Sequence, residues 1–309
     1  MLSVGYRGTA PYKTVMTHGF VVDQDTRKKT SKSDDKKKGK PTDASYFYNK
    51  NGADILRLWV SSVDWQTEVP FGEDLFKQIT EPYRRIRNTL RILLGNLDGF
   101  DPATDAVTPD DLTLVDRWIL ERLHEVVSEC RHAYECYEFR KVFSVINQFC
   151  AYDLSAIYVD LTKDRLYCDA VDSQRRRASQ TAMNEVFDAL VKLLAPILAF
   201  TAEEGWEHAG REGSVHEQDF PVPDERFAGR EATGEVNELL ELRGVIQTAI
   251  QSQVQGKAFN KSNEASVELV LPADHGARKH LTARDFAIEF FIIADLKLAE
   301  GGKISASAV

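Results

Sequence analysis

The sequence predicts a mainly α-helical protein with a short mixed α/β start and a small α+β end. Apolar residues recur every three or four positions through most of 105–210, which is the spacing of amphipathic helices. Two apolar runs, 13–23 and 265–271, have the pattern of strands instead. The chain has 309 residues, of which 43% are hydrophobic and 28% charged. This is the composition of a globular protein with room for two or three domains.

Composition also limits the class of protein. No apolar run reaches the roughly 18–20 residues that span a bilayer, and the start lacks a signal-peptide pattern. We therefore expect a cytoplasmic protein with no membrane contact. The net charge of −9 argues against indiscriminate nucleic-acid binding, although a local basic cluster could still bind phosphates. The cysteines form no CxxC pair, so we expect reduced core thiols and no bound metal. They are Cys130, Cys136, Cys150 and Cys168.

The first hundred residues alternate short elements with loops. We expect a buried strand at 13–23 and then a loop, 24–45, that holds eight Lys or Arg residues. A short helix should follow at 53–61, and a longer, arginine-rich helix at 74–97. The residues expected to turn inward from the short helix are Ile55, Leu56 and Trp59.

Three long antiparallel helices should form a bundle. The first has Thr108 as a good N-cap and Pro109 at its first position, and the second begins near Glu138. The third spans 173–208, and Pro196 should kink it. Expected core positions are Leu112, Val115, Ile119, Leu123, Val126 and Cys130, then Val142, Ile146, Phe149, Ile157 and Leu161, then Leu190, Leu193, Leu194, Ile197 and Phe200.

The remainder reads as a linker and a small α+β unit. A polar, proline-containing stretch, 209–234, precedes a helix at 235–255. A strand at 265–271, a short helix near 282–290 and a strand at 291–299 should follow. The final residues, GGKISASAV, finish no obvious sheet.

One short motif suggests chemistry. Lys29, Thr30, Ser31, Lys32 and Ser33 place two lysines three residues apart, with small hydroxyl residues between them, in a basic loop after a strand. Ammonium groups and backbone N–H groups of such a loop can close on a polyphosphate. Considered alone, the same residues could also be a solvated run of charge.

The surroundings of this motif extend the pattern. Lys29 to Ser33 resembles the second signature, KMSKS, of class I aminoacyl-tRNA synthetases. "THGFVVD" before it and "GADILRLWVSS" after it resemble the flanks of that signature in isoleucine–tRNA ligases. "EPYRRIRNTLRILLGNL", "DRWILERL", "DLSAIYVDLTKDRLYCD", "LLAPILAFTAEEGWEH" and "KAFNKSNEASVEL" continue the resemblance in order, so that it covers roughly 7–299.

The resemblance implies an architecture. Residues 1–62 would be the end of a class I, Rossmann-type catalytic core that carries the signature loop. Residues 63–104 would be stem helices, 105–225 an all-α anticodon-binding bundle, and 226–309 a helix with a small α+β segment.

The resemblance also implies an activity. Such enzymes attach isoleucine to tRNA(Ile), with ATP and Mg²⁺ as substrate. Lys29 and Lys32 would stabilise the leaving pyrophosphate, and Thr30, Ser31 and Ser33 would shape the loop. We expect no protein-bound metal in this chain.

Departures from the family pattern limit what this chain should do alone. Thr30 stands where the family usually has Met, and Asp34-Asp35-Lys36 replaces the usual Leu-Gly-Asn. The other class I signature, HIGH, is absent, so we expect no activity without an upstream polypeptide that carries it. Isoleucine binding would also need that half. The alternatives are a stand-alone tRNA-binding module without catalysis and a fragment with no independent role.

An arginine cluster is the candidate RNA contact. Arg84, Arg87 and Arg91 share one helix face and could follow a phosphate backbone. The other interpretation is a solvated face with local acidic neighbours. Trp118 and Trp206 lie in apolar stripes and should be core residues. His18 should be structural, although it could approach ATP.

Overall fold

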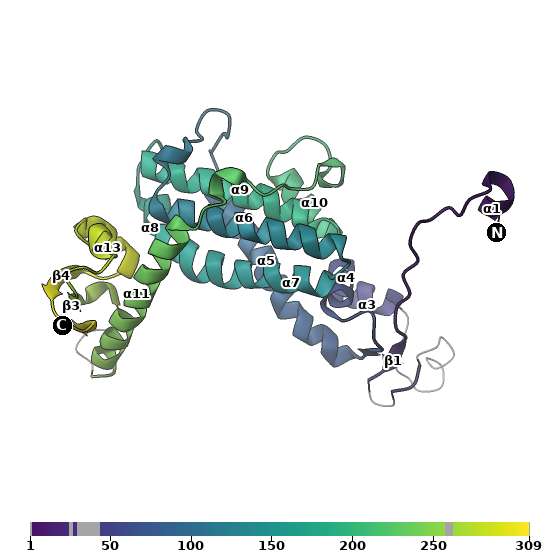
Figure 1. The fold of residues 1–309 in the computed structure, drawn as a ribbon, viewed down its shortest axis with the longest axis horizontal. Coiled ribbons are helices and arrows are strands. Elements are labelled where there is room, and N and C mark those ends of the chain that lie inside the picture. Colours follow the sequence, from purple (N-terminus) through teal and green to yellow (C-terminus); the bar gives the residue numbers. More distant parts are fainter. Residues whose placement is uncertain (1, 25–26, 30–43, 257–261, 309) are drawn as a thin grey trace.

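The computed structural model describes residues 2–24, 27–29, 44–256 and 262–308. A bundle of helices forms the middle of an elongated molecule (Figure 1). The N-terminal segment extends from one end, and a small α+β unit occupies the other. This order of a mixed start, a helical middle and an α+β end confirms the predicted fold class in its coarse form.

The N-terminal part is built on a pair of very short parallel strands. Strand β1 pairs with β2 in the register Val21↔Val69, Val22↔Pro70 and Asp23↔Phe71. The strand predicted at 13–23 is therefore confirmed only for its last three residues. The elements here are α1 (Leu2–Arg7), β1 (Val21–Asp23), α3 (Ala44–Asn51), α4 (Ala53–Ser62) and β2 (Val69–Phe71).

A cluster of aromatic rings forms the core of this part. Phe47 of α3 stacks on Phe76 with ring centroids 4.8 Å apart. Phe71 meets Phe47 edge-on at 4.7 Å, and Trp59 of α4 meets Phe71 at 5.3 Å. These contacts fix α3 and α4 against β2 and the start of the next helix, because large rings bury much apolar surface at defined angles.

The predicted bundle is present, and its helices are more broken than the sequence suggested. The long arginine-rich helix is α5 (Glu73–Asn96). The remaining bundle helices are α6 (Leu114–Glu135), α7 (Phe139–Gln148), the π-helix η2 (Phe149–Tyr158), α8 (Val159–Cys168), α9 (Gln174–Leu194), α10 (Ala199–His208) and α11 (Glu231–Gln255). Trp118 and Trp206 are buried, as predicted.

The helices α7, η2 and α8 form one continuous stretch, Phe139–Cys168, that is long and apolar enough to cross a membrane by length and composition. Its buried side chains pack inside the bundle against α5, α6 and α9. We therefore interpret it as a core helix. The hydroxyl of Ser155 donates to the carbonyl of Cys150 at 2.6 Å, five residues back, across the wide turn of the π-helix.

The predicted start of the first bundle helix is wrong by five residues. Thr108 precedes only a 3-10 turn, Pro109–Asp111, and donates its hydroxyl to Asp111 at 2.7 Å. The helix α6 begins after Thr113, which forms a reciprocal capping box with Asp116. The true cap is preferred because Asp116 reaches back to Thr113 and is itself fully buried.

The third predicted helix is two helices. Between α9 and α10 the chain leaves the helical path at Ala195–Leu198, because Pro196 cannot continue the hydrogen-bond ladder. The break changes the rotational phase of α10. Phe200, predicted to face the core, is consequently 69% exposed, and that prediction is wrong.

The C-terminal unit is a three-stranded sheet with two short helices. Its elements are β3 (Ser266–Leu271), α12 (Arg278–Leu281), α13 (Arg284–Phe291), β4 (Asp295–Glu300) and β5 (Ser305–Ala308). The strand order is β4-β3-β5, with β4 parallel and β5 antiparallel to β3. The interpretation that the last residues finish no sheet is wrong, since Ala308 pairs with Val267.

A buried charge connects this unit to the bundle, and another holds the last bundle helix. Arg165 of α8 is 3% exposed and donates to Glu289 of α13 at 2.8 Å. Arg243 of α11 donates to Asp160 of α8 at 2.6 Å. Burial raises the pKa of Asp160, but the hydrogen bonds from Lys163 and Arg243 outweigh it, and the net shift is downward. The carboxylate therefore stays ionised at neutral pH and holds its cationic neighbours.

A second set of contacts ties the N-terminal part to the bundle. Asp54 of α4 is buried and accepts hydrogen bonds from the backbone N–H of Phe200 and Thr201, at 3.3 and 2.7 Å. One turn later, Arg57 donates to the carbonyls of Pro196 and Ile197, at 2.7 and 2.8 Å. Asp54 thus caps the start of α10 from a different helix, and Arg57 holds the break that precedes it. We call these contacts of Asp54 and Arg57 the α4 clamp.

Removal of the buried carboxylate from the α4 clamp should destabilise the protein. In Asp54→Ala, the first N–H groups of α10 lose their acceptor away from water, which should reduce the free energy of unfolding by about 1–3 kcal/mol. Thermal unfolding followed by far-UV circular dichroism would show a lower midpoint. Asp98→Ala, at an exposed position after α5, is the control and should not change it. Equal midpoints for the two variants would contradict the capping role.

The cysteines should divide into two classes. Cys130 and Cys150 are buried, and burial raises the pKa of each thiol to about 12, so almost no reactive thiolate exists at neutral pH. Cys136 and Cys168 are exposed, which corrects the prediction that all four are core residues. A disulfide-exchange reagent should titrate these two at once and the others only after denaturation. Rapid reaction of all four would contradict this arrangement.

Candidate functional site

The predicted phosphate-binding loop starts directly from β1. After Asp23 the chain turns tightly, since the N–H of Asp23 donates to the carbonyl of Lys28 and the N–H of Arg27 donates back to Asp23, at 2.8 and 2.9 Å. Arg27 has the left-handed φ of 54° that such a turn requires. Lys29 then bridges to Val22, which is fully buried. The first lysine of the motif is thereby held beside the strand.

The side chain of Lys29 has an aromatic neighbour. Its ammonium lies 3.4 Å from the ring centroid of Phe20, which is a cation–π contact at an exposed site. Such a contact is worth about 0.5–1 kcal/mol, so an anionic ligand can displace it readily. The other residues of the motif, Thr30, Ser31, Lys32 and Ser33, lie outside the described residues.

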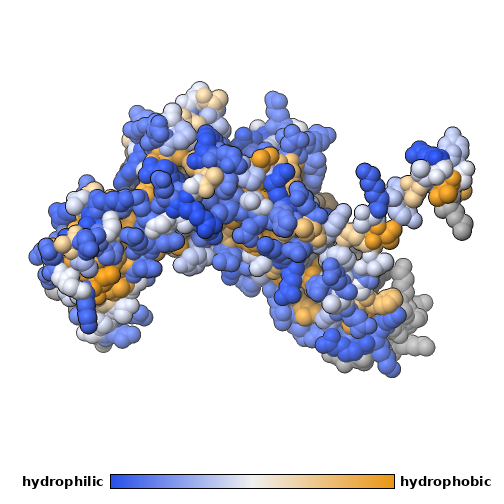
Figure 2. All heavy atoms as spheres, viewed as in Figure 1, coloured by the Kyte–Doolittle hydropathy of each residue, from blue (hydrophilic) through white to orange (hydrophobic). Residues whose placement is uncertain are grey.

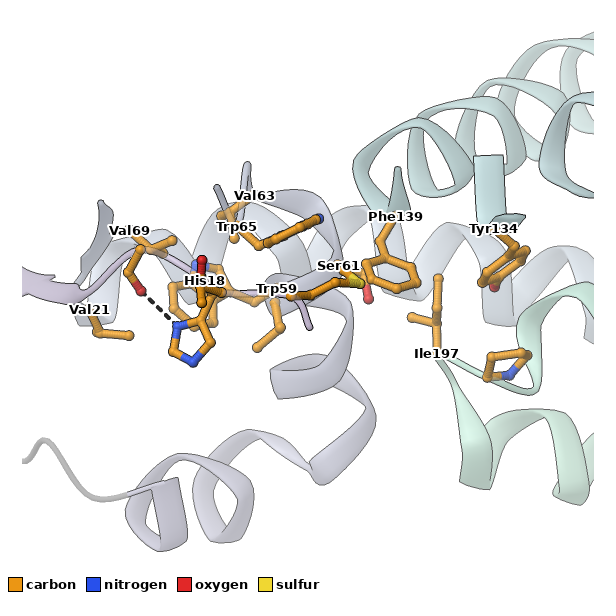
Figure 3. Close-up of a pocket in the computed structure, with 15 residues that line it drawn as sticks. His18, Val21, Trp59, Ser61, Val63, Trp65, Val69, Tyr134, Phe139 and Ile197 are labelled. Atoms are coloured by element: carbon orange, nitrogen blue, oxygen red, sulfur yellow. Dashed lines mark hydrogen bonds between the residues drawn. The ribbon is translucent and has the colours of Figure 1, made fainter. Parts of the chain in front are cut away.

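Beside β1 lies an apolar hollow of about 500 Å³, between the N-terminal part and the bundle. Trp59, Val63 and Trp65 form one wall, and Phe139 and Ile197 face them from the bundle (Figure 3). The α4 clamp maintains this geometry, because Arg57 holds the carbonyl of Ile197.

Gly19 and His18 lie at the edge of the hollow. The N–H of Gly19 donates to the carbonyl of Trp65 at 2.8 Å, and a Cβ at Gly19 would lie 1.7 Å from the carbonyl oxygen of Thr67. Only glycine fits there, which explains why glycine follows His18 in the sequence. His18 lines the hollow, with Nδ1 2.8 Å from the carbonyl of Gly19 (Figure 3).

The candidate RNA-binding arginines have acidic neighbours. Arg84 pairs with Glu81 at 2.9 Å, and Arg87 donates twice to Glu204 of α10, at 2.8 and 2.9 Å. These hydrogen bonds to Glu204 raise the pKa of Arg87 above its usual range. Arg91 is exposed, and within the described part of the chain no ion pair is found for it. The three arginines are therefore unequal, which could not be foreseen from their spacing.

Arg87 and Arg91 share a second hollow, of about 280 Å³, with residues of α10. Thr201, Glu204 and His208 line its other side. Two arginines and a histidine therefore line a hollow with a single glutamate, which pairs with Arg87. An incoming phosphate would compete with Glu204 for Arg87 and would meet Arg91 without such competition.

Among the residues that the structure describes, no group of three or more His, Cys, Asp or Glu side chains is placed to hold a metal ion.

Two family models match the chain. One, described as the anticodon-binding domain of tRNA ligase, matches residues 116–269, which include most of the bundle. The other, described as tRNA synthetases class I (I, L, M and V), matches residues 1–71, which contain the signature loop and the α4 clamp residues. The two matches have the same order as the predicted core end and bundle.

Curated relatives agree with these matches. The chain is 41% identical over 306 residues to an isoleucine–tRNA ligase of Symbiobacterium thermophilum, a match that covers 97% of this chain and 32% of the relative. It is 42% identical over 303 residues to that of Brevibacillus brevis, covering 96% of this chain and 32% of the relative. The chain thus spans about a third of the length of these relatives.

A solved structure shares the fold. The LeuRS of Agrobacterium radiobacter K84, in a ternary complex with tRNA and LeuAMS, superposes with a TM-score of 0.52 over 93% of this chain and 33% of that one, at 15% identity. The likeness at this identity concerns the fold alone. The sequence matches carry the assignment further: the chain belongs to the class I tRNA synthetases and, among them, to the isoleucine–tRNA ligase family.

Proposed function

We propose that this chain is the part of a cytoplasmic isoleucine–tRNA ligase that supplies the pyrophosphate-stabilising loop and the tRNA-binding bundle. In the reaction, the carboxylate of isoleucine attacks the α-phosphorus of ATP. The bond from that phosphorus to the oxygen bridging to the β-phosphorus breaks, and pyrophosphate leaves with its electron pair. A ribose hydroxyl at the 3′ end of tRNA(Ile) then attacks the carbonyl carbon, and AMP leaves. ATP enters as its Mg²⁺ complex. The observation that carries the proposal is the collinear match to isoleucine–tRNA ligases over nearly the whole chain.

The role of Lys29 follows from its position. An ammonium that lies on Phe20, directly before the first residue of β1, is close to the strand yet weakly held. When pyrophosphate charge develops, the ammonium can leave the ring for a phosphate oxygen, which it binds more strongly as a charge-assisted contact. Lys32 would act alongside it, and Thr30, Ser31 and Ser33 would shape the loop. Catalysis would then be electrostatic and positional, with no covalent protein nucleophile.

The α4 clamp supports a joint role for loop and bundle. Asp54 and Arg57 lie in the region of the class I match, and their hydrogen-bond partners lie in the bundle, at the start of α10 and in the break that precedes it. A tRNA held on the bundle would therefore be held at a fixed distance from β1, after which the signature motif begins. Such positioning contributes to rate because it removes motions that would otherwise have to be restricted in the transition state.

Activity should be absent in the isolated chain. Lys29 and Lys32 can neutralise charge, but groups on the opposite side of the nucleotide are needed to orient the α-phosphorus, and no HIGH segment occurs in this sequence. We expect no isoleucine-dependent ATP–pyrophosphate exchange above a blank. The complete enzyme of Brevibacillus brevis would serve as the positive control. Exchange by the isolated chain would show that it holds a complete nucleotide site.

The bundle should bind tRNA through the hollow of Arg87 and Arg91. Arg91→Gln should weaken the binding of every tRNA about equally and reduce the slope of log affinity against log salt by about 1. Glu204→Gln should have the opposite effect and strengthen binding, because it releases Arg87 from its competitor. Filter binding over a salt series, with cognate and non-cognate tRNA, measures both.

A matched control is available in a different element. Arg226 is an exposed arginine in the turn Glu225–Phe227 and pairs with Asp224. Arg226→Gln removes the same charge and should leave tRNA affinity unchanged apart from a small general effect. If Arg91→Gln and Glu204→Gln behave like this control, RNA contacts another surface. Absence of binding by the wild-type chain at any salt concentration would contradict the tRNA-binding role itself.

A further inference from the structure

A further hollow, of about 450 Å³, lies where the N-terminal part meets the start of α7. The segment between α4 and β2 forms one side of it through Trp65, and the turn between α6 and α7 forms the other through Tyr137 and Phe139. Trp65 points from the N-terminal part towards Phe139 (Figure 3). Three aromatic rings from two parts of the chain thus line one space, which we call the aromatic hollow.

The turn that carries Tyr137 has an unusual backbone conformation. Tyr137 has a left-handed φ of 59°, which costs energy for a residue with a large side chain. The N–H of Tyr137 donates to the carbonyl of Tyr134 at 3.1 Å, and the indole N–H of Trp65 donates to the Tyr137 carbonyl at 2.9 Å. Tyr137 is nevertheless 45% exposed. The strained turn therefore presents an aromatic side chain to solvent and does not bury it.

Two cationic side chains line the same hollow. Arg140 is exposed, and within the described part of the chain no ion pair is found for it. Lys141 lies 3.8 Å from Glu129, and both side chains are about half exposed, so this pair is weak. Most of the bundle surface in the view of Figure 2 is hydrophilic, so cations alone would not distinguish this place. Cations beside exposed rings are the combination that binds single-stranded nucleic acid, because rings stack on bases and cations contact phosphates.

Two carboxylates narrow the class of ligand. Asp64 and Glu138 also line the aromatic hollow, and the carboxylate of Asp64 accepts from the N–H of Gln66 at 3.0 Å. A bare phosphate would be repelled by these groups. A nucleobase carries amino groups that can donate to a carboxylate, while its phosphate contacts the cations. The mixture of charges therefore favours a nucleotide over an inorganic anion.

We propose that the aromatic hollow binds one unpaired nucleotide of an RNA, with the base against Trp65 and Tyr137 and an adjoining phosphate on Arg140. The base has to be unpaired, because bases inside a duplex do not offer their faces to a protein ring. The inference rests on the proposed function, which makes RNA the ligand of this chain. It adds a subsite that shares no residue with the hollow of Arg87 and Arg91.

The base contact and the phosphate contact can be tested separately. Tyr137→Asn removes the ring and keeps a residue that tolerates the left-handed conformation. It should weaken the binding of fluorescein-labelled octacytidylate by at least about fivefold, the loss of one stacked base, with an unchanged salt dependence. Arg140→Gln should reduce the slope of log affinity against log salt by about 0.7. Tyr167 is 71% exposed on α8, and Tyr167→Asn is the matched control, which should bind like the wild type. Fluorescence anisotropy over a salt series measures all three variants.

The unchanged chain offers a readout that does not depend on the folding of a variant. Cys136 is exposed and directly precedes Tyr137, whereas Cys168 is exposed at the end of α8. Saturating octacytidylate should slow the reaction of Cys136 with a disulfide-exchange reagent by at least about threefold and leave that of Cys168 unchanged. An RNA duplex or inorganic phosphate should protect neither thiol.

Each other outcome overturns the inference. Absence of octacytidylate binding, or equal effects of Tyr137→Asn and Tyr167→Asn, would mean that the hollow holds no base. Protection of Cys136 by phosphate would make it a simple anion site, and equal protection by free CMP would assign it to a mononucleotide. The tRNA measurements with Arg91→Gln do not involve this hollow. If they succeed while Tyr137→Asn binds like the wild type, the inference fails and the proposed function stands. Failure of tRNA binding itself would instead contradict the proposed function.

Discussion

The α4 clamp is the interaction on which the arrangement of this protein depends. Pro196 ends α9, and a second helix starts only a few residues later, so the junction has carbonyl groups without helical partners on one side and N–H groups without partners on the other. Arg57 supplies donors to the first set and Asp54 supplies acceptors to the second. One turn of α4 thus satisfies both ends of a helix break. Without it, the bundle and the N-terminal part that carries β1 would lose these directional contacts.

The same solution recurs at the other end of the bundle. Glu121 of α6 is buried and accepts from the backbone N–H groups of Ala232 and Thr233, at 3.1 and 2.7 Å, so it caps α11 as Asp54 caps α10. Both carboxylates lie at positive helix ends, where a negative charge is favoured and the burial of that charge is compensated. In the first case a side chain of the N-terminal part caps a bundle helix, and in the second a bundle side chain caps the helix that leads to the C-terminal unit. The elongated shape is held by directional contacts as well as by apolar packing.

Local sequence patterns predict most of the helices but few of the junctions between them. The apolar stripe from Leu112 to Cys130 is buried, because helical spacing alone determines which face packs inward. The true cap Thr113 was missed because Thr108 with Pro109 has equally good local chemistry, and only the burial of Asp116 distinguishes them. Lys29 could be placed after a strand from sequence, but the pairing of Arg87 with Glu204 could not. Those residues are 117 positions apart, and the contact exists only once α5 and α10 pack together.

The pairing of Arg87 with Glu204 indicates how a chain of net negative charge could bind RNA in the proposed function. An exposed ion pair is worth about 0–1 kcal/mol, so Glu204 restrains Arg87 only weakly. A phosphate that offers charge-assisted contacts to both Arg87 and Arg91 can displace the carboxylate, whereas an isolated anion gains little from the exchange. The site would then discriminate RNA from other anions by the spacing of successive phosphates. Net charge would not contribute, because it is −9 and repels nucleic acid at long range. At the proposed RNA site, the carboxylate of Glu204 would thus favour an RNA backbone of the right shape without blocking access to Arg87.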